Sequence, residues 1–253
     1  MLLALAAISL VASASQCKTS SGQYKTALIE LYTSEGCSSC PPADSWLRKL
    51  PKQDYAGNKV VPLAFHVDYW DYLGWSDGFA KKQYTQRQRR VASINRLNTI
   101  YTPQVVIDGR DFRFWFWGGR TRSKISGVTR MPAQAKIELI VNKTEGNKLM
   151  ATSNIMLLPQ NYPKQLSVFM ALYQNNLTSS VSAGENRGRQ LKHDFVVRDL
   201  RGPFNFHGKS VKKIEQDFYL DKSWNPADIG IAVFVQDQNN GEILQALSSE
   251  KCS

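Results

Sequence analysis

LIELYTSEGCSSCPPADSW, residues 28–46, is the stretch that decides the fold. It begins with an apolar run typical of a strand, continues through a turn at residues 34–36, and reaches a helix that opens at a Cys-x-x-Cys pair. Unpaired backbone N–H groups and the helix dipole favour negative charge at such a helix start. The pattern therefore predicts a thiol pair, Cys37 and Cys40, that closes as a disulfide or separates into a thiolate and a thiol.

The flanking segments extend this unit into an α/β domain. Strands are predicted at residues 26–32, 58–68 and 104–108, with a helix at 41–50 between the first two. Residues 74–98 read as a long helical insertion before the third strand. The aromatic segment FRFWFW then leads to Gly118-Gly119 and a short helix at residues 120–125. This succession predicts an α/β domain over residues 24–130.

Composition changes after Met131-Pro132. From there β-type runs recur, among them AKIELIV, QLSVFMALYQ and IGIAVFVQD, separated by turn-rich stretches. Seven strand candidates of this kind predict an antiparallel β-sandwich domain over residues 131–253.

The overall composition indicates a globular protein with ample core material, at 42% hydrophobic residues. The formal net charge of +11 predicts attraction to acidic partners or an anionic surface. Because the lysines and arginines are scattered, we interpret them as solvated faces and do not expect nucleic-acid binding.

The first 14 residues, MLLALAAISLVASA, are uncharged and end in a small-x-small pattern, so they read as a signal peptide. No apolar run is long enough for a membrane span. We therefore expect a periplasmic or secreted protein, in which disulfides persist. Cys17 and Cys252, near the two ends of the mature chain, are a plausible second pair; two free thiols are the alternative.

The Cys-x-x-Cys motif has three interpretations: a redox pair, half of a zinc site, or chance. A structural zinc site needs four ligands, and no second Cys-x-x-Cys or close Cys/His pair is present. The strand–turn–helix context favours the redox pair, with Cys37 attacking and Cys40 resolving the mixed disulfide.

Thr102-Pro103 stands directly before the third predicted strand. Proline has no N–H to donate, so it is tolerated at a strand start or edge. Together with the cysteine motif, it predicts a cis-proline that faces the disulfide and leaves backbone groups free for a substrate. An ordinary trans bond is the alternative.

Several of these motifs together resemble a known family. CSSC after a strand, TP before VVIDG and a later GG look like the thioredoxin superfamily, with the TPQVVIDG…GG succession most similar to its glutaredoxin branch. ELYTSEGCSSCPPAD, FHVDYWDYLGW, YTPQVVIDG and GENRGRQLKHDFVVR are similar to a bacterial family of exported thioredoxin-like proteins of unknown function. The resemblance implies a thioredoxin-like domain and its cysteine pair, and it supplies no substrate.

Glu30 lies close to the position where thioredoxin-like proteins carry a buried acid that moves a proton for the second cysteine. Burial would raise the pKa of such a carboxyl and suit it to general-base work. A solvent-facing strand residue is an equal alternative.

A polar and aromatic run follows the second strand, where α/β folds place ligands. We interpret its members as a substrate-binding wall beside the disulfide; they are His66, Asp68, Trp70 and Trp75. Two other interpretations remain open: a packed core histidine with an aromatic loop, and a copper site formed by His66 with the two thiolates.

The sequence thus predicts an exported thiol–disulfide oxidoreductase that needs no cofactor and acts on protein or small-molecule thiols. Thr102 and Pro103 would complete its substrate-binding face. The alternatives are a copper carrier and a non-catalytic thioredoxin-like binding module. The loop GENRGR, residues 184–189, could face the first domain, but we favour a turn held by its own salt bridges.

Overall fold

The computed structural model describes residues 16–52, 59–144, 147–158 and 165–249. Strands hold 44% of the described residues and helices 19%. The predicted signal peptide at residues 1–14 and Cys252, the predicted partner of Cys17, lie outside the described residues.

A single eight-stranded sheet runs through the molecule. Its strands, in spatial order, are β14 (Ile243–Ser248), β13 (Ile229–Asp237), β8 (Leu166–Gln174), β11 (Val196–Asn205), β3 (Val60–His66), β2 (Ala27–Thr33), β4 (Gln104–Ile107) and β5 (Arg110–Asp111). The β11–β3 and β3–β2 pairs are parallel and the other neighbours are antiparallel. Strands from both halves of the chain therefore meet at the β11–β3 seam.

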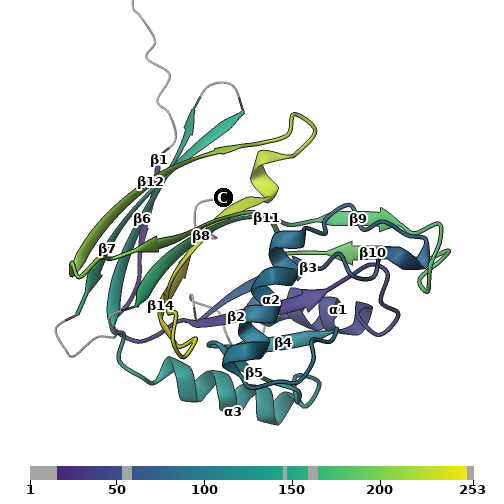
Figure 1. Cartoon of the computed structure of the whole chain (residues 1–253). Coiled ribbons are helices and arrows are strands. Elements are labelled where there is room, and N and C mark those ends of the chain that lie inside the picture. The colour runs from purple at the N-terminus through teal and green to yellow at the C-terminus, as the bar shows by residue number, and fades with distance from the viewer. Residues whose placement is uncertain (1–15, 53–58, 145–146, 159–164, 250–253) are drawn as a thin grey trace, which may run out of the picture.

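A second, four-stranded antiparallel sheet packs against the C-terminal half of the first. It consists of β1 (Gln16–Ser20), β6 (Ala135–Thr144), β7 (Lys148–Leu157) and β12 (Val211–Tyr219), in that order. The hairpin of β9 (Leu177–Ser180) and β10 (Gln190–His193) extends from the long sheet toward the helices (Figure 1).

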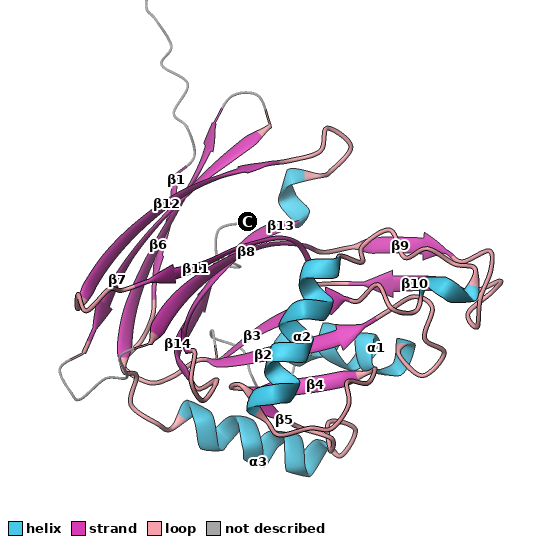
Figure 2. Ribbon diagram, viewed as in Figure 1, coloured by secondary structure: helices cyan, strands magenta, loops and turns pink. Residues whose placement is uncertain are grey.

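The helices gather around the other half of the long sheet (Figure 2). They are α1 (Pro41–Lys49), α2 (Lys82–Ile94) and α3 (Gly118–Thr129), with short 3-10 turns at Leu50–Lys52, Asp71–Leu73 and Pro226–Asp228. Two prolines open α1, where missing N–H groups disturb no helical hydrogen bond. A hydrogen bond of 2.9 Å from the Tyr84 hydroxyl to the Val197 carbonyl ties α2 to β11, across the seam.

The described residues form two hydrophobic cores, which lie on opposite faces of the long sheet at β8 and β13. Along β8, Val168, Met170 and Leu172 face the four-stranded sheet, while the intervening residues of β8 belong to the core under the helices. Strand β13 alternates in the same way. Since successive strand residues point to opposite faces, a strand buried on both faces needs a continuous apolar run, as β8 and β13 have.

The predicted fold class, an α/β thioredoxin-like domain with a helical insertion followed by an antiparallel β-sandwich domain, is wrong. The molecule is mostly β-sheet and sandwich-like, with three α-helices in its described part. The cause is the continuous apolar runs after residue 131. They predict a separate sandwich domain, but β8 and β13 are buried on both faces and form one sheet with β2 and β3. The βαβ order of β2, α1 and β3 is present locally.

Candidate functional site

Cys37 and Cys40 form a disulfide directly before α1, with their Cα atoms 5.4 Å apart. Backbone hydrogen bonds of 3.2 Å, from Cys37 N to Ser34 O and from Cys40 N to Cys37 O, fold residues 34–40 into two consecutive turns. Cys40 is the N-cap of α1. Strand β2, the turn and the prolines at residues 41–42 thus hold the pair at the helix start that the sequence predicts.

The disulfide is buried beneath its own loop. Cys37 is 1% exposed and Cys40 is fully buried, whereas Ser38 and Ser39 between them are exposed. The Sγ atom of Cys37 lies 3.3 Å from the Ser39 hydroxyl. A reagent therefore reaches the sulfur atoms only if a neighbouring segment moves.

The loop at residues 184–189, between β9 and β10, covers the cysteine loop. The Asn186 side chain is fully buried, and its amide donates to the carbonyls of Glu35 at 2.8 Å and Cys37 at 2.9 Å. Glu185 accepts a 2.9 Å hydrogen bond from the Ser38 N–H. The favoured interpretation, a turn held by its own salt bridges, is thus wrong, and the loop contacts the first half of the chain. Asn186 lies 149 positions from Cys37, and no local pattern announces a contact at that separation.

Trp70 connects the cysteine loop to the Thr102–Pro103 segment. Its indole N–H donates to the Thr102 hydroxyl at 2.7 Å. On its other side, a Cβ atom built at Gly36 would lie only 3.0 Å from the Cβ of Trp70, so glycine is needed for this approach. The Thr102–Pro103 bond is cis, as predicted. Trp70 thus links Thr102 to the cysteine loop, and the side chains of Trp70, Thr102 and Pro103 are half-buried.

His66 ends β3 in a buried ion pair with Asp77. Its Nδ1 atom lies 2.7 Å from the Asp77 carboxylate, and both side chains are fully buried. Burial alone would lower the pKa of His66. The negative charge of Asp77, with smaller effects from Asp44 and Glu35, outweighs burial, so the pKa of His66 is raised. Burial alone would raise the pKa of Asp77, but His66 and two backbone N–H groups lower it. The neighbouring carboxylates therefore favour the protonated form of His66, which lies in the core at the base of the site.

Further buried ionisable groups link this pair to α1 and β10. His193 of β10 lies 3.2 Å from a Glu35 carboxylate oxygen and 3.9 Å from an Asp44 oxygen, within ion-pair distance but without hydrogen-bond geometry. Its ring centre is 5.0 Å from that of His66. The Trp75 indole donates to Glu35 at 2.8 Å. Trp75 thus positions the acid beside the cysteine loop.

Asp44 is the carboxyl that α1 carries one turn after Cys40. On a helix, residues four apart have Cβ atoms about 5–6 Å apart on one face. Burial raises the pKa of Asp44, partly offset by His193 and His66 and by the Thr33 hydroxyl, which lies 3.2 Å away. Sequence reasoning missed Asp44, although its spacing from Cys40 was a usable signal.

Glu30 is buried, so the solvent-facing alternative is wrong. Its carboxylate accepts a 2.6 Å hydrogen bond from Arg87 of α2. The Arg87 guanidinium also lies over the rings of Phe169 and Phe234, at 5.0 Å from each centre. Glu30 therefore joins the long sheet to α2.

Asp68 is likewise engaged with α2, because its carboxylate accepts a hydrogen bond from the Thr85 hydroxyl. It was predicted to line the substrate wall with Trp70 and Trp75. In the structure its side chain fixes the start of the loop that carries those two tryptophans.

Comparison with known proteins relates the chain to a family. The family model described as "Protein of unknown function (DUF1223)" matches residues 28–236. The chain belongs to this family. The prediction that the chain belongs to a family of unknown function is confirmed. The family match does not support membership of the thioredoxin superfamily.

Solved structures similar to this DUF1223 protein share its fold. Protein AGR_C_4864 from Agrobacterium tumefaciens is 24% identical, with a TM-score of 0.62 over 90% of this chain and 95% of that one. HBP35 of Porphyromonas gingivalis is 18% identical, with a TM-score of 0.67 over 90% of this chain and 75% of that one. No curated protein matches the sequence.

The described part of this DUF1223 protein contains no candidate metal centre. Across residues 16–249, leaving out the gaps named above, no group of three or more His, Cys, Asp or Glu side chains could hold a metal ion. The Nδ1 atom of His66, the proposed third copper ligand, is paired with Asp77. In the same part of the chain, no helix is long and apolar enough to cross a membrane.

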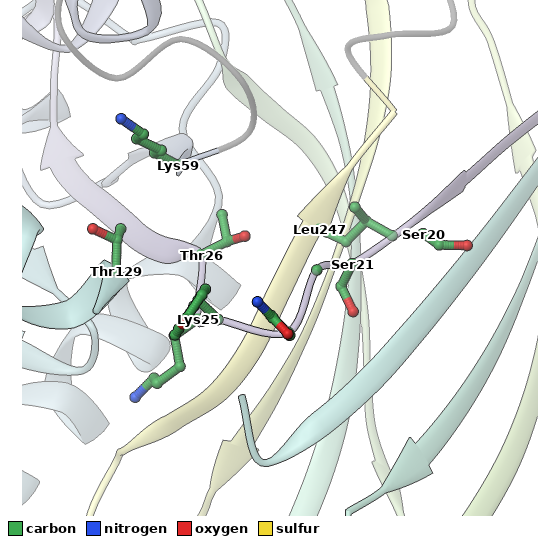
Figure 3. A pocket seen from close by; sticks show the side chains of 10 residues that line it. Ser20, Ser21, Lys25, Thr26, Lys59, Thr129 and Leu247 are labelled. Carbon is green, nitrogen blue, oxygen red and sulfur yellow. The ribbon is translucent and has the colours of Figure 1, made fainter. Parts of the chain in front are cut away.

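A cavity of about 440 Å³ lies elsewhere, where β1 leads into β2 (Figure 3). Ser20, Ser21, Thr26 and Lys59 are among its lining residues. The Lys25 ammonium, which also borders the cavity, is paired with Asp108 at 2.6 Å. None of the predicted site residues lines this cavity.

Proposed function

We propose that this protein is an exported thiol–disulfide oxidoreductase that acts on a protein or small-molecule thiol or disulfide. The observation that carries the proposal is the Cys37–Cys40 disulfide at the start of α1, beside the half-buried Trp70 and Thr102. A helix N-terminus stabilises a thiolate, which is the nucleophile in thiol–disulfide exchange. A closed disulfide also agrees with a location outside the cytoplasm.

The reaction needs no group other than the two cysteines and the substrate. When the pair is reduced, the Cys37 thiolate attacks one sulfur of a substrate disulfide, and the other substrate sulfur leaves as a thiolate. Cys40 then loses its proton and attacks the Cys37 sulfur, which releases the second substrate thiolate. Two electrons pass from the cysteine pair to the substrate, and the reverse sequence oxidises a substrate dithiol.

Asp44 is suited to take the proton from Cys40. It lies on the Cys40 face of α1, and its buried carboxyl has a raised pKa, which makes it a stronger base than an exposed aspartate. Glu30, the acid predicted for this role, is paired with Arg87. We therefore assign the proton transfer to Asp44 rather than to Glu30.

Substrate access requires the loop at residues 184–189 to move away from the cysteine loop. Asn186 and Glu185 contribute three hydrogen bonds to this closed arrangement. When the loop moves, Cys37 becomes accessible beside Trp70, Trp75, Thr102 and Pro103, whose side chains are half-buried. These residues would form the substrate-binding face.

The burial of both cysteines favours a second candidate function. A disulfide that is 1% exposed at Cys37 and fully buried at Cys40 also suits a non-catalytic binding module in which the bond only fastens the loop to α1. The two functions differ in one respect: an oxidoreductase exchanges its disulfide with partners, whereas a binding module keeps it closed.

Trapping experiments with Cys40→Ser distinguish the two candidates. Without the resolving thiol, Cys37 of an oxidoreductase should accumulate mixed disulfides in an extract of the producing cells, visible as bands that a reductant removes. The double variant Cys37→Ser/Cys40→Ser is the matched control and should form none. Absence of mixed disulfides from a folded Cys40→Ser protein would favour the binding module.

A further inference from the structure

The segment at residues 112–120 exposes a cluster of aromatic side chains. Phe114, Phe116 and Trp117 are 43%, 59% and 48% exposed. The other large hydrophobic side chains exposed in the described part of the chain are separate in sequence, and of these Met156 and Val211 are cross-strand partners. Scattered exposed apolar residues are ordinary, but a contiguous group marks an interaction site.

Ring contacts join these side chains into one surface. Phe116 and Trp117 have ring centres 5.7 Å apart, and Phe114 lies at the same distance from Trp117. Trp115 packs inward at 5.7 Å from Trp46 of α1, so the cluster is anchored to the body of the protein. Gly118 and Gly119 have no atom near their Cβ positions, which leaves the surface open on that side.

The cluster is interleaved with positive charge. The Arg120 guanidinium lies 4.3 Å from the centre of the Phe114 ring and 4.5 Å from that of Trp117. Residues 110–124 contain five arginines and lysines against a single acid, Asp111. That acid is largely buried, accepts hydrogen bonds from Tyr101 and Gln104, and pairs with Arg113 at 3.3 Å, which leaves the other four basic residues. The outward charge of the segment is therefore positive.

We propose that the segment at residues 112–120 is a docking surface for an anionic phospholipid bilayer. Phenylalanine and tryptophan partition into the interfacial region of a bilayer, and arginines beside them pair with anionic headgroups. The net charge of +11 draws the whole molecule toward such a surface. This inference goes beyond the thiol–disulfide function and does not depend on it.

Co-sedimentation of the full chain with lipid vesicles tests the proposal. Binding is expected to mixed vesicles of phosphatidylcholine with phosphatidylglycerol, to weaken with added salt, and to be absent with phosphatidylcholine alone. Phe116→Ala/Trp117→Ala should weaken binding by roughly tenfold or more, because the inserted apolar surface is lost. Arg120→Gln/Arg122→Gln should weaken it by roughly fivefold for each charge removed.

Matched control variants place similar changes elsewhere. Tyr219→Ala removes a side chain that is 71% exposed on β12, and Lys209→Gln/Lys222→Gln removes two exposed charges. Tyr219→Ala should keep wild-type binding, and Lys209→Gln/Lys222→Gln should weaken binding far less than Arg120→Gln/Arg122→Gln, although both double variants lower the net charge equally. Trp117→Phe should also bind, but the blue shift of tryptophan fluorescence on vesicle addition should shrink. Because Trp117→Phe keeps an aromatic side chain and still binds, a smaller blue shift would report insertion of residue 117 and not a folding defect. Cys37→Ser/Cys40→Ser should bind as the wild type does.

Several results would overturn the proposal. One is equal binding to neutral and anionic vesicles, or none to either. Another is unchanged binding in folded Phe116→Ala/Trp117→Ala protein. A dimer in sedimentation velocity that this variant dissolves, without vesicle binding, would assign the surface to a second copy of the chain. Tighter binding to single-stranded DNA than to vesicles would assign it to a nucleic acid.

Discussion

Asn186 is the residue on which access to the disulfide depends most directly. Its buried amide donates to two carbonyl oxygens of the cysteine loop. Asn186→Ala removes both hydrogen bonds and leaves the Glu35 carbonyl without its donor, which destabilises the closed loop by about 1–3 kcal/mol. We expect dithiothreitol to reduce the Cys37–Cys40 bond roughly 5- to 100-fold faster in this variant, because the open form is more populated.

Asn154→Ala is the matched control, because Asn154 makes its side-chain hydrogen bond to Glu138, within the four-stranded sheet. Its reduction rate should equal that of the wild type. If Asn186→Ala also kept the wild-type rate, the loop at residues 184–189 would not control access to the sulfur atoms.

Asp44 is predicted to serve the second chemical step. In Asp44→Asn, a mixed disulfide between Cys37 and a model peptide should resolve about 100-fold more slowly, since the amide cannot accept the Cys40 proton. Burial raises the pKa of Asp44, so the wild-type rate should fall as the pH drops through that raised pKa. The resolution rate of Asp44→Asn should not show this fall at low pH, which we call the acidic limb of the rate profile.

Quenched-flow measurement of peptide release over a pH series checks the Asp44 prediction. Asp217→Asn, which alters an acid paired with Lys148 on the four-stranded sheet, is the control and should behave as the wild type. An acidic limb retained in Asp44→Asn would assign the proton transfer to another group.

At the scale of elements, the His66–Asp77 pair fastens the end of β3 to the segment before α2. His66 has a raised pKa, so its contribution to stability is complete below its unfolded pKa of about 6.5 and is lost as the pH rises through the folded value. Asp77 has a lowered pKa, so its contribution is present above about 3.9 and is lost as the pH falls through the folded value. The pair is therefore most stabilising between about pH 4 and 6.5.

Asp77→Asn should destabilise the protein by about 3–5 kcal/mol near pH 5.5, because His66 stays buried without its counter-charge. Above the raised pKa of His66, the loss should shrink to the part due to the backbone hydrogen bonds that Asp77 accepts from Glu35 and Phe79. Urea unfolding of both proteins at the two pH values measures the difference. A loss of stability that does not vary with pH would contradict a charged pair.

The elements with local signals were predictable from sequence. The β2–turn–α1 unit and its Cys-x-x-Cys pair each depend on a few neighbouring residues, and both are present. The cis bond at Pro103, which is also present, was predicted from Thr102-Pro103 together with that cysteine pair. The contacts of Asn186 and His193 with the cysteine loop depend on chain segments about 150 positions apart, and periodicity carries no information at that range.

Glu30 illustrates the same limit within the site. The sequence identified an acid on β2 but left its environment open. Burial of Arg87 under Phe169 and Phe234 decides that environment, and these rings come from strands of the other half of the chain.

At the scale of the whole molecule, one sheet unites both halves of the chain. Since β8 and β13 contribute to both cores, neither core can form without them. We therefore expect a single cooperative unfolding transition in urea, with coincident midpoints by tryptophan fluorescence and far-ultraviolet circular dichroism. Five of the six tryptophans precede residue 131, so fluorescence reports mainly on that half. Two separated transitions would show that the halves fold independently.

The reduction potential of the Cys37–Cys40 pair tests the central claim most directly. Equilibration of the folded protein with glutathione or dithiothreitol buffers, followed by thiol alkylation, gives the value. A working exchange pair should titrate between about −270 and −120 mV, the range of disulfide oxidoreductases. A potential below about −300 mV, which is typical of structural disulfides, would contradict the proposed redox function.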